Sequence, residues 1–337
     1  MSRDVPDPGK VVRPLLRWYA RARRDLPWRG SRDPYRVWVS EIMLQQTQVE
    51  RVRDYFIRFV RRYPTVAALA GAREADVLRL WEGLGYYRRA RQLHAAARAI
   101  VADHGGRMPR TPEELRRLPG IGRYTAGAIA SIAFGARAPI VEANSRRVLA
   151  RLVGHVAPVG GAAGDGPLWE VAERLVPARE PGLFNQALMD LGAGVCTPDR
   201  PLCGRCPLAE VCVAHRTGRV AEIPAAAPRR AAKIVRETAV VERRGGRVLV
   251  ERRGPDEWWE GLWDFPRARG LARGRRLGTV TYTVTHHKVT CRVVERVAAG
   301  AVPPATRNAR WVTPRGLAGL ALSAPGRRIA RLIAGES

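Results

Sequence analysis

Four cysteines lie close together between positions 196 and 212, and their spacing constrains the fold more than any other feature of the sequence. Intervals of six, two and five residues separate Cys196, Cys203, Cys206 and Cys212. Four thiolates this close together can wrap one compact metal centre. A structural zinc site usually takes two separated C-x2-C pairs, and only one such pair is present. We therefore favour a [4Fe–4S] cluster over zinc or unligated thiols.

The charge of the chain indicates a polyanionic partner. There are 59 basic and 31 acidic residues among 337, which gives a formal net charge of +28. An arginine-rich codon usage explains why only three of the basic residues are lysines, but it does not explain the excess of basic over acidic residues. Nucleic acid is the simplest partner for such a surface.

The sequence shows neither a membrane span nor a signal sequence, and this indicates the cellular compartment. No apolar run is long enough to span a membrane, and the N-terminal segment Met1–Lys10 contains no apolar signal sequence. We expect a cytoplasmic protein that does not bind membranes. In that reducing compartment, cysteines serve as metal ligands rather than as disulfides. Cys291 stands alone in a strand pattern, where a packed core position is expected.

Apolar residues recur with helical spacing through the first two thirds of the chain, and we expect no strand before residue 230. Asp33-Pro34 is typical of a helix start, with Asp as N-cap and Pro at the first position. The predicted helices are 11–23, 34–44, 47–63, 74–82, 88–104, 112–117, 123–134, 143–153, 167–176 and 181–192. Residues 219–233, rich in Ala, Pro and Arg, predict a linker.

Beyond the linker, the apolar period changes to two. Residues 234–241 and 248–250 flank Gly245-Gly246, which predicts a hairpin. A second alternating pair covers 280–284 and 289–293, and the chain ends on a helix over 326–334. This pattern predicts an α+β domain over 234–337.

A glycine turn lies between two short helical stretches, about residues 113–134, with Gly120 and Gly122 in the turn. Such a turn exposes backbone N–H groups to an anion such as phosphate. Glu142 follows twenty residues after Gly122, where its carboxylate would face the adjacent sugar. A simple helix C-cap followed by a loop is the alternative interpretation.

In this order, the glycine turn, the carboxylate and the cysteine loop resemble the helix–hairpin–helix DNA glycosylases with the endonuclease III fold. Within that superfamily, the chain resembles the adenine DNA glycosylase (MutY) family. The matching stretches are Leu26-Pro-Trp-Arg29, Glu41-Ile-Met-Leu-Gln-Gln-Thr-Gln-Val49, Trp81-Glu-Gly-Leu-Gly-Tyr-Tyr87, Leu118 to Ala128, the cysteine loop, and Arg253 to Pro266 of an appended Nudix-like domain.

The resemblance implies a mostly α, two-lobed helical glycosylase domain over 1–218, with the helix–hairpin–helix and the 4Fe–4S loop (196–212). The linker 219–233 and an α+β Nudix-like domain over 234–337 follow. No cluster of glutamates follows the matching stretch in that domain, so pyrophosphate hydrolysis is not expected. The implied activity is excision of adenine mispaired with 8-oxoguanine or guanine in double-stranded DNA, during base excision repair, by a monomer associated with the nucleoid.

Two carboxylates can divide the chemistry of N-glycosidic cleavage, which needs an acid for the leaving base and an anion for the sugar cation. Glu41 lies in an apolar helix, where burial would raise its pKa and keep it protonated. The resemblance assigns it protonation of the purine. Glu142 stands where the family has aspartate, since Glu142-Ala-Asn144-Ser replaces Asp-Gly-Asn-Val. Its reach is longer by about 1.5 Å, and we expect the backbone to be set back to compensate.

Lysine usage predicts a monofunctional enzyme. Glycosylases that also nick DNA form a Schiff base through a lysine amine, and the chain has no lysine between Lys10 and Lys233. The superfamily's lyase lysine would fall at Tyr124, which cannot form an imine. We expect Tyr124 either to bond near the leaving sugar or to pack.

The resemblance also implies the residues that handle DNA. Gln45, Gln46, Leu84 and Tyr86 would fill the gap in the stack and grip the opposite base, although Tyr86 could also be a core residue. Trp28, Arg29 and Gln186 match adenine-pocket positions, and core packing is the alternative for Trp28. The family reads 8-oxoguanine through a Phe-Ser-His loop. Here Val284-Thr285-His286 keeps a hydroxyl and loses the aromatic ring, which predicts reduced or altered recognition, with a plain hairpin turn as the alternative.

Two other functions remain open at this point. One is a glycosylase of the same superfamily directed at thymine or oxidised pyrimidines, and the other is a mismatch-binding protein without catalysis. Lack of a lysine between Lys10 and Lys233 disfavours the lyase form of the first. Glu41 disfavours the second.

Overall fold

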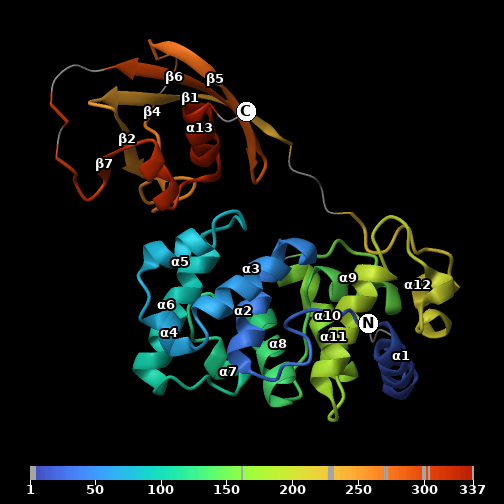
Figure 1. Cartoon of the computed structure of the whole chain (residues 1–337). Coiled ribbons are helices and arrows are strands. Elements are labelled where there is room, and N and C mark those ends of the chain that lie inside the picture. Colours follow the sequence, from blue (N-terminus) through green and yellow to red (C-terminus); the bar gives the residue numbers. More distant parts are fainter. Residues whose placement is uncertain are drawn as a thin grey trace. The chain divides into compact units, whose positions relative to one another are not determined.

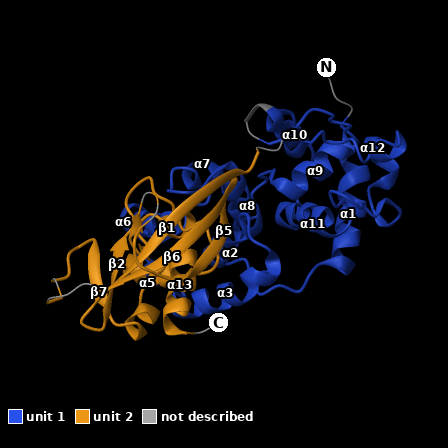
Figure 2. Ribbon diagram, turned by 90° about the horizontal axis from the view of Figure 1, so that it is seen from above, with its two compact units in different colours: residues 1–71, 92–228 blue, residues 72–91, 229–337 orange. Residues whose placement is uncertain are grey.

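The computed structural model describes residues 5–160, 162–226, 231–268, 270, 272–297, 301–302 and 304–335. The chain divides into two compact units (Figure 2). Unit 1 comprises residues 1–71 and 92–228, and unit 2 comprises residues 72–91 and 229–337. Unit 2 thus includes a segment that the sequence pattern places in the helical domain. Among the described residues, no helix is both long enough and apolar enough to cross a membrane.

The part of the chain that precedes the linker is helical, as predicted (Figure 1). The helices are α1 (Pro8–Ala22), α2 (Pro34–Leu44), α3 (Val49–Arg62), α4 (Val66–Ala70), α5 (Glu74–Leu80), α6 (Arg88–His104), α7 (Pro112–Leu115), α8 (Arg123–Phe134), α9 (Ala143–Leu152), α10 (Ala162–Leu175), α11 (Pro181–Gly194) and α12 (Val213–Arg216). Two 3-10 turns, η1 (Cys203–Arg205) and η2 (Ala209–Val211), shape the cysteine loop.

Three helices of unit 1 differ from the prediction in their presence or in where they begin by several residues. The sequence predicts a helix over 167–176, but α10 begins at Ala162 and contains Pro167. Asp165 lies in its first turn, accepts from the Gly160 N–H at 2.9 Å and pairs with Arg146 at 2.8 Å. These tertiary contacts override the local preference. The sequence predicts neither α4 nor α12, since helices so short show no apolar period.

Helix α2 begins as the sequence predicts. The Asp33 side chain accepts from the Tyr35 N–H at 2.9 Å, and Pro34 occupies the first position. Eight of its eleven residues are buried, Glu41 among them. A helix that is buried nearly all round places any charged side chain it carries in the interior.

One hydrophobic core of unit 1 lies where α1 packs with α9, α10 and α11. Its buried members include Leu15 and Tyr19 of α1, Leu149 of α9 and Leu188 of α11. Burial of large apolar side chains at about 1.5–3 kcal/mol each fixes these helices against one another. The core therefore sets the positions of α9 and α11 relative to α1.

Unit 2 contains a mixed seven-stranded sheet of order β3-β2-β1-β6-β5, with β4 paired to β1 and β7 to β2. The strands are β1 (Lys233–Arg244), β2 (Arg247–Arg252), β3 (Trp263–Asp264), β4 (Arg267–Ala268), β5 (Arg275–Val284), β6 (His287–Val297) and β7 (Ala309–Val312). Strands β1 and β6 are parallel. One 3-10 turn, η3 (Arg315–Gly319), precedes α13 (Ala324–Ala334).

Both predicted hairpins are present. Arg244 pairs with Arg247 across Gly245-Gly246, and Val284 pairs with His287 across the β5–β6 turn. Cys291 is fully buried in a core that also contains Ile329 of α13, as predicted. Strands β3, β4 and β7 were not predicted, because such short strands carry no clear alternation. The predicted linker 219–233 includes 227–230, which lie outside the described residues, and its last residue, Lys233, starts β1.

Candidate functional site: a buried acid beside a helix-capping carboxylate

Glu41 is a buried carboxyl group of unit 1. Its residue is 5% exposed, near the C-terminal end of α2, among Val39, Ile42 and Met43. Burial raises its pKa, and the negative charge of Glu142 raises it further. A hydrogen bond from Tyr124 and the positive charge of Arg29 act in the opposite direction. Burial is the largest of these effects, so the pKa of Glu41 lies above its ordinary value, which is the direction that the sequence predicts.

Tyr124 joins this acid from the first turn of α8. Its hydroxyl donates to Oε2 of Glu41 and lies 3.3 Å from the sulfur of Met189. Burial raises the pKa of the Tyr124 phenol well above its ordinary value, and the charges of Glu41 and Glu142 add to this effect. Tyr124 is therefore a permanent hydrogen-bond donor. The sequence leaves open whether Tyr124 packs or makes a polar contact, and the structure shows a polar contact with Glu41.

Glu142 is the N-cap of α9. Its two carboxylate oxygens accept from the backbone N–H groups of Asn144 and Ser145, each at 2.8 Å, and the Ser145 hydroxyl accepts from the Glu142 N–H at 2.9 Å. This capping box folds the side chain back onto the helix. The extra methylene relative to aspartate is thus taken up by the cap. An anion is stabilised at this end of a helix.

Two glycines allow the backbone near Glu142 to approach its neighbours. A Cβ at Gly127 of α8 would overlap the Pro139 carbonyl oxygen, just before Glu142 in the chain. A Cβ at Gly192 of α11 would lie 2.7 Å from the Asn144 Cβ. Neither glycine has a positive φ, so close packing explains both. They bring α8 and α11 against the two ends of the segment that carries Glu142.

Two arginines of α9 connect this segment to the cysteine loop. Arg147 donates to Asn144 Oδ1 at 3.0 Å, to the Gly192 carbonyl at 2.7 Å and to the Cys196 carbonyl at 2.7 Å. Arg151 is 3% exposed, and its Nη1 lies 3.3 Å from Cys196 Sγ and 2.7 Å from the Thr197 carbonyl. The helix that begins at Glu142 therefore holds the first cysteine of the loop.

The four predicted metal-ligating cysteines line one small cavity of unit 1, which Arg151 and His215 also line. All four side chains are partly buried, and none of them forms a disulfide. Burial raises the pKa of Cys206 to about 12, and the other three cysteines add to the effect. In the part of the chain that the structure describes, no three His, Cys, Asp or Glu side chains converge as they would around one metal ion. Four sulfurs around a shared cavity suit a polynuclear cluster, and Arg151 supplies a cationic donor to one of them.

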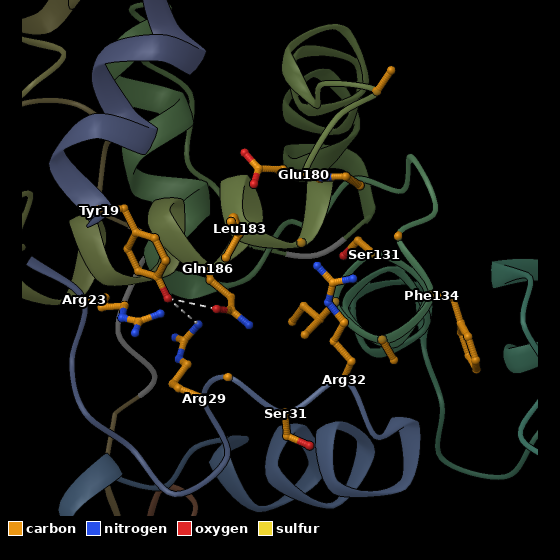
Figure 3. Close-up of a pocket in the computed structure, with 17 residues that line it drawn as sticks. Tyr19, Arg23, Arg29, Ser31, Arg32, Ser131, Phe134, Glu180, Leu183 and Gln186 are labelled. Atoms are coloured by element: carbon orange, nitrogen blue, oxygen red, sulfur yellow. Dashed lines mark hydrogen bonds between the residues drawn. The ribbon is translucent and has the colours of Figure 1, made fainter. Parts of the chain in front are cut away.

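A pocket of about 420 Å³ lies between the segment before α2 and the start of α11 (Figure 3). Arg29 and Gln186, two of the predicted adenine-pocket residues, both line it, and so does Tyr19. Arg29 donates to the Tyr19 hydroxyl at 3.3 Å, and Tyr19 donates to Gln186 Oε1 at 2.8 Å. Asp190, with its side chain 2% exposed, anchors Arg29 at 3.1 Å and Arg24 at 2.6 Å.

The third predicted pocket residue, Trp28, lies in the core. It is 4% exposed, and its ring packs edge-on against Phe56 with centroids 5.4 Å apart. An indole with this much apolar area gains more from packing than from lining a polar opening. Trp28 therefore packs in the apolar interior, one residue before Arg29 in the chain, and its contact with the base stays a prediction.

The predicted DNA contacts of unit 1 are accessible to different degrees. Gln46 is exposed, with φ +54°, and Gln45 ends α2 and donates to Thr125 Oγ1 at 3.3 Å. In the glycine turn, Gly120 and Gly122 are exposed and Ile121 is buried. Gly120 has φ +75°, and no side chain caps α8 at Gly122. These are the features of an open anion site.

Within unit 2, Leu84 and Tyr86 lie on one loop before α6. Tyr86 is 51% exposed with φ +48°, whereas Leu84 is only 5% exposed. The buried guanidinium of Arg89 donates to the carbonyls of Leu84 at 3.3 Å and Gly85 at 3.2 Å. Leu84 and Tyr86 are both predicted to fill the gap in the base stack. Of the two, only Tyr86 presents its side chain to solvent. The aliphatic side chain of Leu84 is buried in this structure, and its insertion into the base stack stays a prediction.

The predicted recognition loop is a tight hairpin turn. Thr285 and His286 are its two central residues, since Val284 pairs with His287. Thr285 is exposed, has φ +53° and donates to the Val284 carbonyl at 2.7 Å. Positive φ in a β-branched residue is strained.

Sequence reasoning missed Tyr19, Asp190, Arg147 and Arg151. Tyr19 contacts Gln186 across 167 positions and Asp190 contacts Arg29 across 161, so no local motif links them. Arg147 and Arg151 lie four residues apart on α9, as expected for one helix face. The spacing of Arg147 and Arg151 is the one feature of the sequence that indicates a shared role for these residues.

Comparisons with known proteins identify the family of the chain. Residues 39–158 match the family described as HhH-GPD superfamily base excision DNA repair protein, and residues 237–332 match the NUDIX domain. The chain is 36% identical to the adenine DNA glycosylase of Rattus norvegicus, over 98% of this chain and 79% of the relative. It is also 36% identical to that of Homo sapiens, over 100% of this chain and 76% of the relative.

Solved structures show the same helical fold. A thermostable thymine-DNA glycosylase aligns at a TM-score of 0.57 and 32% identity, covering 62% of this chain and 97% of that one. A non-covalent endonuclease III–DNA complex aligns at 0.53 and 21% identity, covering 63% and 98%. The helical part of the chain therefore has the endonuclease III-like fold.

The fold and the site define a helix–hairpin–helix protein of base excision DNA repair with an appended Nudix-like domain. Within that class, identity of 36% over nearly the whole chain is decisive. The chain belongs to the adenine DNA glycosylase family.

Proposed function

We propose that this chain excises adenine from mispairs in double-stranded DNA, with Glu41 as the acid that protonates the departing base. The observation that carries the proposal is the environment of Glu41. It is a carboxyl group whose pKa is raised by burial, bonded to Tyr124 and close enough to Glu142 for the charge of Glu142 to raise the pKa further. A neutral acid beside an anion is the division of labour that N-glycosidic cleavage needs.

Glu142 supplies the anion in this proposal. Its carboxylate is held by two backbone N–H groups at the start of α9, and Asn144 is bound in turn by Arg147. Groups held in advance stabilise a developing charge without the cost of reorganisation. As the sugar becomes an oxocarbenium-like cation, the fixed carboxylate stabilises it, by charge or by a transient covalent bond.

The base leaves in the direction of Gln186 and Arg29. Arg29 lines the pocket beside Gln186 and is also close enough to Glu41 to lower its pKa. We place the extruded base with one edge toward Glu41 and another toward Gln186. Arg29 then lies beside both residues.

The product is an abasic site, and the strand is not cut. A lyase needs an amine, and the residue at the lyase position is Tyr124, whose hydroxyl bonds to Glu41. Borohydride reduction during turnover should trap no more covalent protein–DNA complex than it does with a catalytically dead variant.

A [4Fe–4S] cluster fits the four cysteines, and it would hold the loop 196–212 in its folded shape. Cys196, Cys203, Cys206 and Cys212 would be its ligands, with Arg151 donating to Cys196. Iron and acid-labile sulfide in equal amounts in the purified protein test this proposal. Zinc alone would contradict it.

DNA is bound by turns in both units. The exposed glycine turn would take a phosphate on its N–H groups, Gln45 and Gln46 would contact the opposite base, and Tyr86 would stack in the gap left by the adenine. The protein acts as a monomer on A:8-oxoguanine and A:G mispairs. Thr285 and His286 contribute to recognition of 8-oxoguanine, and a reduced preference for it over guanine is the expected consequence of Val284.

Removal of thymine is the second candidate, favoured by 32% identity to a thymine-DNA glycosylase over 62% of the chain. One assay separates the two candidates. Duplexes with A, T, U or an oxidised pyrimidine opposite G or 8-oxoguanine are incubated with enzyme in excess, and released base is measured. Adenine should be released fastest in both contexts, and preferential release of thymine would overturn the proposal.

A further inference from the structure

Four polar side chains form a chain of polar contacts beside the pocket of Figure 3. We call this chain the relay, because each of its hydrogen bonds has a defined donor and acceptor. Asp190 holds Arg29, Arg29 donates to the Tyr19 hydroxyl at 3.3 Å, and Tyr19 donates to Gln186 Oε1 at 2.8 Å. Tyr19 is 3% exposed and Gln186 is 7% exposed, so water competes little for these bonds. Burial also raises the pKa of Tyr19, which keeps its proton in place.

The relay has one permitted direction. A guanidinium can only donate, so the Tyr19 oxygen accepts from Arg29 and the Tyr19 proton must be given onward. The amide oxygen of Gln186 receives it. Turning the amide over would set its N–H2 group against the phenol proton. A glutamine side chain alone does not define which end of its amide is oxygen and which is nitrogen. The hydrogen bonds from Arg29 through Tyr19 define it, so Gln186 has one orientation.

That orientation leaves a specific pattern toward the pocket. Gln186 Nε2 lies on the side away from Tyr19 in Figure 3, and it can donate. Oε1 keeps a second lone pair. The amide thus offers a donor beside an acceptor. Adenine offers the complement, an exocyclic amine beside a ring nitrogen that accepts. Hypoxanthine carries a carbonyl oxygen in place of the amine.

We propose that Tyr19 is a positioning residue for base specificity, which locks the Gln186 amide in the orientation that accepts adenine and rejects a base with a 6-keto group. The inference rests on the proposed function, since it takes adenine as the extruded base. A site built to hydrogen-bond one group rejects an analogue that lacks it, because buried polar atoms are then left unpaired. Without the hydrogen bond from Tyr19, the Gln186 amide can turn over and pair with either adenine or hypoxanthine.

The test compares single-turnover release of adenine and hypoxanthine, each placed opposite guanine, by wild type and Tyr19→Phe. The matched control is Tyr35→Phe, which also deletes a buried phenol that donates, in this case to the Tyr63 carbonyl at 2.7 Å. The readout is the ratio of two rate constants in one preparation, so the folded fraction of a variant cancels. Gln186→Ala and the double variant complete a cycle.

Tyr19→Phe should lower the adenine-over-hypoxanthine ratio by about tenfold or more, while Tyr35→Phe leaves the ratio unchanged. In the Gln186→Ala background, Tyr19→Phe should have no further effect on the ratio. An unchanged ratio in Tyr19→Phe, or full additivity with Gln186→Ala, would overturn the inference and leave adenine excision intact. No adenine release by wild type would instead overturn the proposed function.

Discussion

The hydroxyl of Tyr124 donates a hydrogen bond to the carboxyl group of Glu41, so the first turn of α8 is tied to the end of α2. This bond joins the two elements on which the site depends, the helix after the glycine turn and the buried helix that carries the acid. It also lowers the pKa of Glu41 against the stronger effect of burial. Tyr124 therefore adjusts the acid that the helix interior creates.

Tyr124→Phe should move the pH profile of base release. Without the donor, the neutral form of Glu41 is favoured further, so its pKa rises and the acid form persists to higher pH. The descending limb of the single-turnover rate should shift upward, while the plateau changes by less than about tenfold. Rates measured across the neutral and alkaline range test this. A limb that moves to lower pH would show that Tyr124 does not act on Glu41 in this way.

Variants of Glu142 separate its charge from its capping role. Glu142→Asp keeps an anion and a good N-cap, so base release should stay within about tenfold of wild type. Glu142→Gln keeps a capping oxygen and loses the charge. We expect a fall of about 100- to 1,000-fold in rate, with a loss of less than about 1 kcal/mol in unfolding free energy. Full activity of Glu142→Gln in a single-turnover assay would remove Glu142 from the mechanism.

Gly192→Ala tests the close approach of α11 to Asn144. A Cβ at this position would lie 2.7 Å from Asn144 Cβ and 2.8 Å from its carbonyl oxygen. The backbone must shift, at a cost of about 1–3 kcal/mol in unfolding free energy, and the start of α9 would move with it. Gly194→Ala is the matched control on the same helix, since its Cβ would meet open space. Equal thermal midpoints for the two variants would contradict this packing.

Because the pKa of Glu41 is raised in the folded protein, the free energy of unfolding should fall as the pH rises. Its folded-state pKa is raised, so the native protein binds a proton that the unfolded chain releases. The associated stability is complete below the unfolded pKa and is lost as the pH rises through the folded one. Glu41→Gln should therefore become more stable relative to wild type as the pH rises above the ordinary carboxyl pKa and through the raised pKa of Glu41. Denaturant titrations at several pH values measure this difference, and a difference of the opposite sign would mean that the ionised form is favoured.

The sequence predicts the elements with strong local signals and misses long-range contacts. Asp33-Pro34 marks the start of α2, and Gly245-Gly246 marks a hairpin, because each depends on residues that are adjacent in the chain. The apolar neighbours of Glu41 predict its burial for the same reason. The relay from Asp190 to Gln186 could not be predicted, since it joins α1, the turn before α2, and α11.

Two further differences have the same origin. Leu84 and Trp28 match functional positions by motif, but motif matches do not report which side chain the fold buries. The fold-back of Glu142 depends on the Asn144 and Ser145 N–H groups at the start of α9. A longer side chain suggests a longer reach, and only the structure shows that the cap absorbs the extra length.

The proposed mechanism depends on protonation of the departing adenine by the buried carboxyl group of Glu41. The most direct measurement is the single-turnover rate of adenine release from an A:G duplex by wild type and Glu41→Gln, with duplex binding measured in parallel. We predict that the variant binds the duplex normally and releases adenine about 100- to 10,000-fold more slowly. A Glu41→Gln enzyme that releases adenine at the wild-type rate would contradict the account.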